Sequence, residues 1–187
     1  MVGDAFGGVV FAVVFAVRDA FGGGSDRVIV YRQEWAGVAT NMTIPEMIRP
    51  YEEKDLDELL EAWYSASMVA HSFLDQSFFD KERKRIPEDY LPNSETWVYV
   101  LDGRVVGFLS LIGDEVGALF VGAKHQRKGI GQALLDHAKT LRDVLELDVF
   151  KNNSIGRSFY KKCGFALVNE HIHEETGFMH LKLRLER

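Results

Sequence analysis

EVGALFVGAKHQRKGIGQALLDHAKTL, residues 115–141, is the stretch of sequence that decides the fold. It begins with an apolar run at 116–121 that predicts a β-strand. Gly129 and Gly131 then open a segment whose apolar residues recur at helical spacing, namely Ile130, Leu134, Ala138 and Leu141. Glycine has no Cβ, so a ligand can approach the backbone N–H groups, and the first turn of a helix favours an anion. The stretch therefore predicts a strand that leads into a helix N-terminus, with a phosphate or pyrophosphate bound there.

The composition is that of a soluble globular domain. Of the 187 residues, 47% are hydrophobic and 27% are charged, so the chain can form one domain with a sizeable core. The formal net charge of −6 argues against a nucleic-acid partner and favours cationic partners. The single cysteine, Cys163, excludes an internal disulfide framework and is compatible with a reducing compartment. We therefore expect a cytoplasmic protein.

The N-terminal residues 1–42 differ from the rest of the chain. An apolar run at 9–17 lies between glycine clusters and follows Asp4 rather than a basic residue. Nine residues are too few to span a bilayer as a helix, and a secretory signal usually has a positive first region. We therefore expect no membrane partner. We interpret 1–42 as a poorly ordered extension outside the fold and 43–187 as the folded domain; a docking strand for a partner is the alternative.

The first part of the folded domain should contain one strand and two helices. A short strand at 47–49 should end its pairing at Pro50. The next helix should begin at Asp55, whose side chain would form a capping box with Glu58. A second helix is expected at 76–86, and its basic run is interpreted as a solvated face rather than a nucleic-acid site.

Three strands should follow as an antiparallel meander. They are the runs at 96–101, 104–112 and 115–121, separated by Asp102-Gly103 and Gly113-Asp114. Asp-Gly and Gly-Asp between such runs are hairpin signals. The rest of the chain should form a helix, a strand, a helix and two strands, at 130–142, 145–150, 154–162, 165–171 and 178–185.

Three interpretations of the glycine turn compete on its own residues. A Walker A loop needs a second glycine followed by Lys and Ser or Thr, and this pattern is missing after Gly122. A dinucleotide-binding turn needs Gly or Ala three residues after Gly131, where Leu134 stands, although Asp148 lies where that motif has its acidic residue. In the third interpretation, the glycines only allow the helix to pack on its strand.

The residues around the turn resemble a known family. The segment Gln126-Arg127-Lys128-Gly129-Ile130-Gly131 matches the Q/R-x-x-G-x-G/A motif of the GNAT acetyltransferases, the GCN-type N-acetyltransferase superfamily. The similarity extends over about residues 48–185, from IRPYEEKDLDEL at 48–59 to NNSIGRSFYKKCGF at 152–165, and is greatest to small bacterial single-domain members. It implies an α/β (α+β) fold with a mixed, mostly antiparallel twisted sheet of six or seven strands and about four helices. The sheet would be splayed between the strands at 115–121 and 145–150, where acetyl-CoA would bind.

The resemblance also implies which residues hold acetyl-CoA. Main-chain N–H groups of the glycine turn would bind the pyrophosphate. Arg127 stands where many members have glycine, which the turn tolerates if its φ is negative, and its cation would lie near the phosphates. Main-chain groups before the turn would pair with the pantetheine arm as an added strand, and an N–H near Val121 would polarise the thioester carbonyl. The expected cofactor-binding residues are Leu119, Phe120, Val121, Gln126, Arg127, Lys128, Gly129, Ile130, Gly131, Gln132, Asn153 and Tyr160, and no metal is expected.

Candidate catalytic residues follow from the same resemblance. Tyr160, at the family's tyrosine position, is the expected general acid for the departing thiolate, and Asn153 would contact CoA, cap the following helix, or do both. Glu115 stands fourteen residues before Gly129, the spacing of the catalytic glutamate in the histone-acetylating branch. It is a candidate base acting through water if burial raises its pKa, and a solvent-facing hairpin residue otherwise. His71 is a second candidate base and a substrate-binding residue near the acceptor entrance.

The resemblance implies an acetyl-CoA-dependent N-acetyltransferase that transfers the acetyl group directly to an amine within a ternary complex. The acceptor would be a protein lysine, a protein N-terminus or a small amine, and the enzyme would be a monomer or a homodimer. The alternative is a non-catalytic acyl-CoA-binding sensor or interaction module. Tyr160 and Asn153 favour catalysis.

Overall fold

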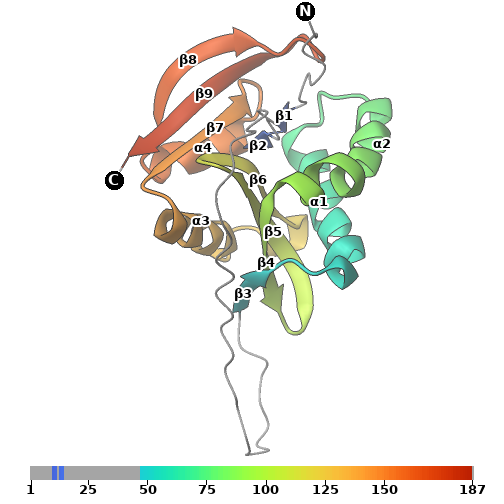
Figure 1. Ribbon diagram of the computed structural model, residues 1–187. Coiled ribbons are helices and arrows are strands. Elements are labelled where there is room, and N and C mark those ends of the chain that lie inside the picture. Colours follow the sequence, from blue (N-terminus) through green and yellow to red (C-terminus); the bar gives the residue numbers. More distant parts are fainter. Residues whose placement is uncertain (1–9, 12, 15–46, 187) are drawn as a thin grey trace, which may run out of the picture.

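The computed structural model describes residues 10–11, 13–14 and 47–186. Residues 47–186 form a seven-stranded sheet with helices on both faces, as the family resemblance implied (Figure 1). Within the predicted extension at 1–42, β1 (Val10–Phe11) pairs with β2 (Val13–Val14) in an antiparallel ladder. The other residues of that extension lie outside the described residues, so its separation from the folded domain stays a prediction.

The large sheet has the strand order β3-β4-β5-β6-β7-β9-β8. Its strands are β3 (Met47–Pro50), β4 (Glu95–Leu101), β5 (Arg104–Ile112), β6 (Glu115–Val121), β7 (Val144–Phe150), β8 (Ala166–Ile172) and β9 (Met179–Glu186). The expectation that Pro50 ends the pairing of the first strand was wrong, because Pro50 lies in register with Trp97 of β4. β3 is an edge strand, and an edge tolerates a residue that cannot donate to the ladder.

The predicted antiparallel meander is confirmed. β4 pairs with β5 and β5 pairs with β6, both antiparallel. Asp102 and Gly103 have φ values of 52° and 77°, the positive pair that a tight hairpin turn requires. Gly113 also has a positive φ, at 57°, in the second hairpin. The dipeptides between the apolar runs therefore supply the residues with positive φ that the two turns contain.

The sheet splays between β6 and β7, as expected. These strands are parallel, and the one residue pair through which they are in register is Glu115 with Glu146. β7 then pairs along its whole length with β9, whereas β6 pairs on its other side with β5. Beyond Glu115, the edge of β6 that faces β7 is not paired with β7, and we call it the open edge of β6; the short strands β1 and β2 lie near β6 and β7.

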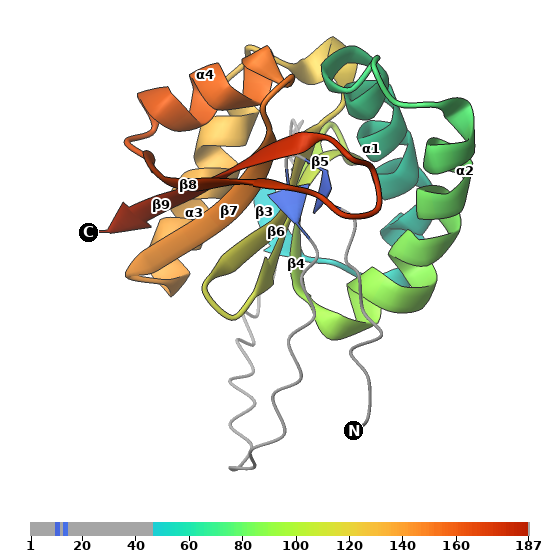
Figure 2. The ribbon, with the colours of Figure 1, turned by 90° about the horizontal axis from the view of Figure 1, so that it is seen from above.

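The helices are α1 (Leu56–Ala70), α2 (Gln76–Arg85), α3 (Ile130–Leu141) and α4 (Ser154–Lys162), with short helical segments η1 (Glu53–Asp55), η2 (Ile86–Tyr90), η3 (Leu91–Asn93) and η4 (Ala123–His125). Figure 2 shows α1 and α2 on one side of the sheet and α3 and α4 on the other. The hydrophobic core accordingly has two parts, one on each face of the sheet. Large buried residues on the α1 side include Trp63, Phe79 and Phe108, and those on the α3 side include Leu134 and Leu147. No helix in the part of the chain that the structure describes is long and apolar enough to span a membrane.

The first helix, α1, has Asp55 as its N-cap as expected, but its capping box was predicted in the wrong place. The capping box lies one turn earlier than predicted, between Glu52 and Asp55, and the Asp55 carboxylate also accepts hydrogen bonds from the Arg49 guanidinium at 2.6 and 2.8 Å. Glu58 instead accepts a hydrogen bond from the Val105 backbone at 2.6 Å. The second helix, α2, ends at Arg85, close to its expected end, and the backbone continues through Pro87 as the π-helix η2.

Candidate functional site

An open cavity of about 770 Å³ lies where α1, β6, the glycine turn and α4 meet. Pockets for small ligands usually have volumes of a few hundred to a thousand cubic ångströms. The sequence-predicted site residues that line it are His71, Leu119, Phe120, Val121, Gln126, Arg127, Gly129, Gly131, Gln132, Asn153 and Tyr160. The structure therefore brings together most of the predicted cofactor-binding residues, which come from β6, the glycine turn, the start of α3, and α4 with its N-cap.

Three predicted residues lie outside this lining. The Lys128 side chain is exposed, and the Ile130 side chain is in the core with 3% of its surface exposed. Glu115 lies at the other end of β6, where that strand pairs with β7. For Lys128 and Ile130 only the main chain is available to a ligand in the cavity, which is the role that the sequence motif gives them.

The glycine turn has a left-handed backbone at two positions. Gly129, the N-cap of α3, has a φ of 87°, and no side chain caps the helix there. Arg127 has a φ of 63°. The condition under which the turn would tolerate arginine, a negative φ, is not met: a non-glycine residue occupies the region that costs L-residues energy. Turns that combine right- and left-handed residues point successive N–H groups into a concavity that binds anions.

One hydrogen bond and one glycine keep the space next to this turn accessible from the cavity. The Gln126 side-chain amide donates a hydrogen bond to the Val121 carbonyl at 3.1 Å, which fixes the turn to the end of β6. At Gly131 a Cβ would lie 3.6 Å from the Phe159 ring and 3.8 Å from a Val121 methyl carbon, both in the cavity wall. A larger side chain at Gly131 would therefore project into the space above the helix N-terminus. This arrangement fits a pyrophosphate held by main-chain donors.

The open edge of β6 fits an extended ligand. Leu119, Phe120 and Val121 are in register with β5 on one side, and beyond Glu115 no residue of β7 is in register with β6 among the described strands. Unpaired main-chain groups of a strand edge bind an extended chain by the same hydrogen bonds that build a sheet. The pantetheine arm of CoA has amide groups that suit such an edge.

Asn153 begins α4 and is 2% exposed. Its Oδ1 accepts a hydrogen bond from the Gly156 backbone at 2.8 Å, so it is the N-cap of the helix. Its Nδ2 lies 3.1 Å from Nε2 of His71, at the end of α1. His71 is 1% exposed, and burial lowers its pKa to about 3, so the ring is neutral at physiological pH.

Tyr160 lies about two turns further along α4 and is 2% exposed. Its ring packs at an angle against Phe159 and Phe165, with centroid separations of 5.2 and 5.4 Å. Burial raises its pKa, so the phenol stays protonated at neutral pH. A protonated phenol in the cavity wall can donate a proton.

A group of carboxylates lies around Lys182 of β9. The Lys182 ammonium is 3.8 Å from Glu115, 3.4 Å from Glu146 and 3.7 Å from Asp148. We call these four residues the Lys182 cluster. Burial raises the pKa of Asp148, and the nearby ammonium of Lys182 opposes this effect.

Sequence reasoning did not identify Asp148 as a member of this cluster, because its spacing was weighed only against a dinucleotide motif. Its signal was a charged residue in the middle of the apolar strand VLELDVF. No group of three or more residues that could hold a metal ion occurs among the residues described.

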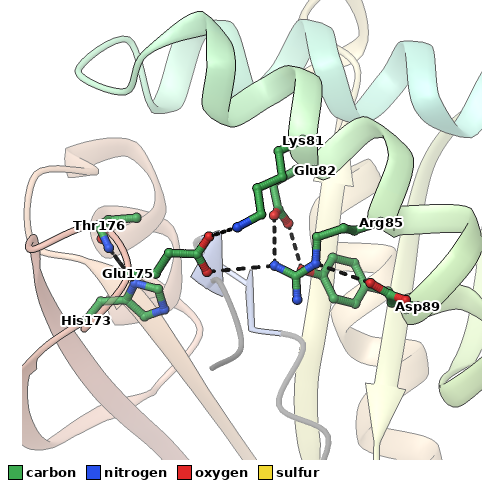
Figure 3. A network of polar contacts seen from close by, with 8 residues as sticks. Lys81, Glu82, Arg85, Asp89, His173, Glu175 and Thr176 are labelled. Carbon is green, nitrogen blue, oxygen red and sulfur yellow. Dashed lines mark hydrogen bonds and ion pairs between the residues drawn. The ribbon is translucent and has the colours of Figure 1, made fainter. Parts of the chain in front are cut away.

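A polar network joins α2 to the turn between β8 and β9 (Figure 3). Lys81 and Arg85 both form ion pairs with Glu175 of that turn. Arg85 also donates to Glu82 at 3.1 Å, and Glu82 is fully buried. The prediction of a solvated basic face on this helix was therefore wrong for Glu82 and Arg85. Glu82 is buried, and Arg85 forms an ion pair with Glu175.

The chain is similar to known acetyltransferases. Residues 92–167 match the family described as Acetyltransferase (GNAT) domain. The chain is 31% identical over 131 residues to the peptidyl-lysine N-acetyltransferase YiaC of Escherichia coli, which covers 70% of this chain and 90% of that protein. The identity and both coverages are the same for the peptidyl-lysine N-acetyltransferase YjaB of Salmonella typhimurium.

Solved structures show the same fold. The solution structure of the apo form of Escherichia coli YjaB superimposes with a TM-score of 0.68 and 26% identity, covering 75% of this chain and 97% of that one. The PaiA N-acetyltransferase of Thermoplasma acidophilum, solved in complex with coenzyme A, gives a TM-score of 0.60 at 20% identity, covering 77% of this chain and all of that one.

The match to YiaC spans most of both chains, and the cavity contains the turn, strand edge and tyrosine that the resemblance implied. The chain therefore belongs to the GNAT acetyltransferase family, and it is an acetyl-CoA-dependent N-acetyltransferase.

Proposed function

We propose that the protein acetylates lysine side chains of other proteins. The observation that carries this proposal is the cavity in which Tyr160, Asn153, the glycine turn and the open edge of β6 meet. Support for lysine as the acceptor comes from the similarity to two proteins named peptidyl-lysine N-acetyltransferases over 90% of their length. The net charge of −6 also suits a cationic acceptor and does not suit nucleic acid.

In this proposal, main-chain donors of the turn from Gln126 to Gln132 hold the CoA pyrophosphate, and Arg127 places a cation beside it. The open edge of β6 from Leu119 to Val121 aligns the pantetheine arm, and an N–H near Val121 polarises the thioester carbonyl. When bound, acetyl-CoA supplies the activated acetyl group. Asn153 fixes the start of α4 and contributes a contact at the cavity wall.

A lysine side chain reaches the site as an ammonium ion and must lose a proton before it attacks. The proposed base belongs to the Lys182 cluster. The spacing to Gly129 supports Glu115, acting through water, and burial raises the pKa of Asp148, the direction that favours acceptance of a proton. Burial and a pKa of about 3 make the His71 ring a poor proton acceptor, so we give it another role below.

Tyr160 is the proposed general acid. Its pKa is raised, so it carries a proton at neutral pH, and it lies in the wall of the cavity. Donation of this proton to the departing thiolate leaves CoA as a neutral thiol. The tyrosine regains a proton from solvent or from the acceptor side after the products leave.

We infer that the enzyme works in the cytoplasm as a monomer or a homodimer. The free thiol of Cys163 supports a reducing compartment.

The test uses purified protein, acetyl-CoA and three acceptors: a peptide with a blocked N-terminus and one lysine, the same peptide with a free N-terminus and no lysine, and a small polyamine. We expect thiol release and a mass increase of one acetyl group on the lysine peptide. Acetylation of only the free N-terminus or only the polyamine would refute the lysine assignment. CoA binding without thiol release from any acceptor would refute catalysis by these residues.

A further inference from the structure

His71 and Asn153 are 82 residues apart in sequence, and their side chains meet inside the protein. His71 ends α1, where its backbone N–H donates to the Ser67 carbonyl at 2.8 Å. Asn153 ends the connection between β7 and α4, and its backbone N–H donates to the Phe150 carbonyl at 2.9 Å. Their contact therefore ties the helix on one wall of the cavity to the helix on the other.

The direction of this hydrogen bond is fixed by the cap. Oδ1 of Asn153 accepts from the Gly156 N–H, so the other end of the amide, the Nδ2 donor, faces His71. Nε2 of His71 must then be the acceptor, and the ring proton lies on Nδ1. Turning the amide over would place its NH₂ group against the Gly156 N–H and break the cap.

The surroundings hold both partners rigidly. The His71 ring packs at steep angles against Phe73 and Phe150, with centroid separations of 6.0 and 5.4 Å. Its low pKa keeps the ring neutral, so one of its two nitrogens is free to accept, and the Asn153 donor selects Nε2. On the other side, a Cβ at Gly156 would lie 2.8 Å from Nδ2 of Asn153, so only glycine lets the amide sit this close to the helix.

We propose that His71 is a positioning residue for the acetyl-CoA site, which holds the Asn153 amide and through it the first turn of α4 in the cavity wall. Ser154, Ile155 and Gly156, the residues of that turn, all line the cavity. The bond thus sets the distance between the end of α1 and the start of α4. This inference rests on the proposed function, because the contribution of Asn153 and α4 to CoA binding is itself proposed.

The first experiment measures CoA affinity by calorimetry in the wild type, His71→Phe and His71→Gln. Phenylalanine keeps an aromatic ring but has no acceptor, so we expect CoA to bind about tenfold more weakly, as for the loss of one buried hydrogen bond. Glutamine offers a carbonyl oxygen near the position of Nε2, and we expect affinity within about twofold of the wild type. Unchanged affinity in His71→Phe, or equal loss in both variants, would overturn the proposal.

Kinetics separate positioning from chemistry. In His71→Phe the KM for acetyl-CoA should rise by about the same factor as the dissociation constant, with kcat within about twofold of the wild type. A fall in kcat at unchanged KM would mean that His71 acts on the reacting groups, and it would overturn the positioning role.

A double-mutant cycle tests whether His71 acts through Asn153. If it does, His71→Phe combined with Asn153→Ala binds CoA no more weakly than Asn153→Ala alone. Additive losses would show independent roles and contradict the proposal. The tautomer offers a test that does not depend on folding of a variant: nitrogen NMR of the wild type should show the proton of the His71 ring on Nδ1, and a proton on Nε2 would overturn the proposal.

The results distinguish this inference from the proposed function. A wild type that binds no CoA would refute the proposed site as a whole. A wild type that binds CoA, together with a His71→Phe variant that binds it equally well, would refute only the role of His71.

Discussion

Tyr90 donates its hydroxyl hydrogen to the fully buried carboxylate of Glu82, with an oxygen–oxygen distance of 2.9 Å. Arg85 donates to the other carboxylate oxygen and lies over the Tyr90 ring, 4.9 Å from its centroid. Burial nevertheless outweighs these contacts and raises the pKa of Glu82 to about 7. Folding therefore favours the protonated form of this acid.

The stability of the protein should depend on pH through Glu82. The folded state binds this proton more tightly than the unfolded state, so the free energy of unfolding should fall as pH rises from about 4.5 to about 7 and change little above that. The contribution is at most about 3 kcal/mol. Urea unfolding at pH 5 and pH 8 measures it, and Glu82→Gln should flatten the difference. Asp89→Asn removes an exposed partner of Arg85 and should keep the wild-type dependence; a Glu82→Gln variant with the wild-type slope would contradict this account.

Removal of the Tyr160 hydroxyl should affect turnover and leave binding intact. Tyr160→Phe keeps the ring that packs against Phe159 and Phe165, so the fold and the affinity for CoA should be unchanged. We expect kcat to fall by about a hundredfold to ten-thousandfold, the usual contribution of a general acid. Steady-state thiol release measures this. Tyr64→Phe, a tyrosine whose hydroxyl is 3.4 Å from Gln76 outside the cavity, is the matched control, and equal activity in Tyr160→Phe and the wild type would exclude the acid role.

Arg127 should show opposite effects on stability and on binding. Arg127→Gly relieves a left-handed residue, and we expect a gain of up to about 1 kcal/mol, since the greater freedom of glycine in the unfolded chain offsets part of the relief. The same change removes a cation from the cavity wall, so the affinity for CoA should fall several-fold. Thermal melting and calorimetry measure the two. Lys128→Ala, at an exposed neighbour outside the cavity lining, should change neither the stability nor the CoA affinity. An Arg127→Gly variant with unaltered CoA affinity would show that the guanidinium does not contribute to CoA binding.

Single substitutions that replace each carboxylate of the Lys182 cluster by its amide should identify the general base. We expect Asp148→Asn to lower kcat by about a hundredfold, because the amide cannot accept the proton and burial raises the pKa of the native carboxylate. Glu115→Gln should cost less, and Glu146→Gln, which removes the third carboxylate around the same lysine, is the control. A larger loss in Glu115→Gln would assign the base to Glu115, and full activity in both would assign deprotonation to solvent. The pH profile of kcat/KM should fall on the acid side wherever the base becomes protonated.

Much of the fold was predictable because its signals are local. Asp102-Gly103 specifies a tight hairpin through the conformational preferences of two residues, and the apolar spacing after Gly129 specifies a helix face. The motif around Gly129 placed Gln126, Arg127, Gly129, Gly131 and Gln132 in the cavity wall. These signals need no knowledge of distant parts of the chain.

The features that the sequence did not reveal depend on distant contacts. Glu82 lies in a run of charges that looks solvated, and its burial results from packing against Tyr90 and Arg85. His71 looked like a possible base, yet its chemistry is set by Asn153, 82 residues later. The positive φ of Arg127 likewise belongs to a turn that the end of β6 and the start of α3 hold in place.

The single pair between Glu115 and Glu146 makes the sheet two half-sheets with a seam. A ligand in the cavity would contact β6 on one side and α4 on the other, so its binding would stabilise the association of the two half-sheets. Any ligand that binds only the folded state raises stability in proportion to the logarithm of its concentration. The resistance of this enzyme to proteases should therefore increase with the concentration of acetyl-CoA, and the enzyme should be degraded more slowly in cells that contain more acetyl-CoA.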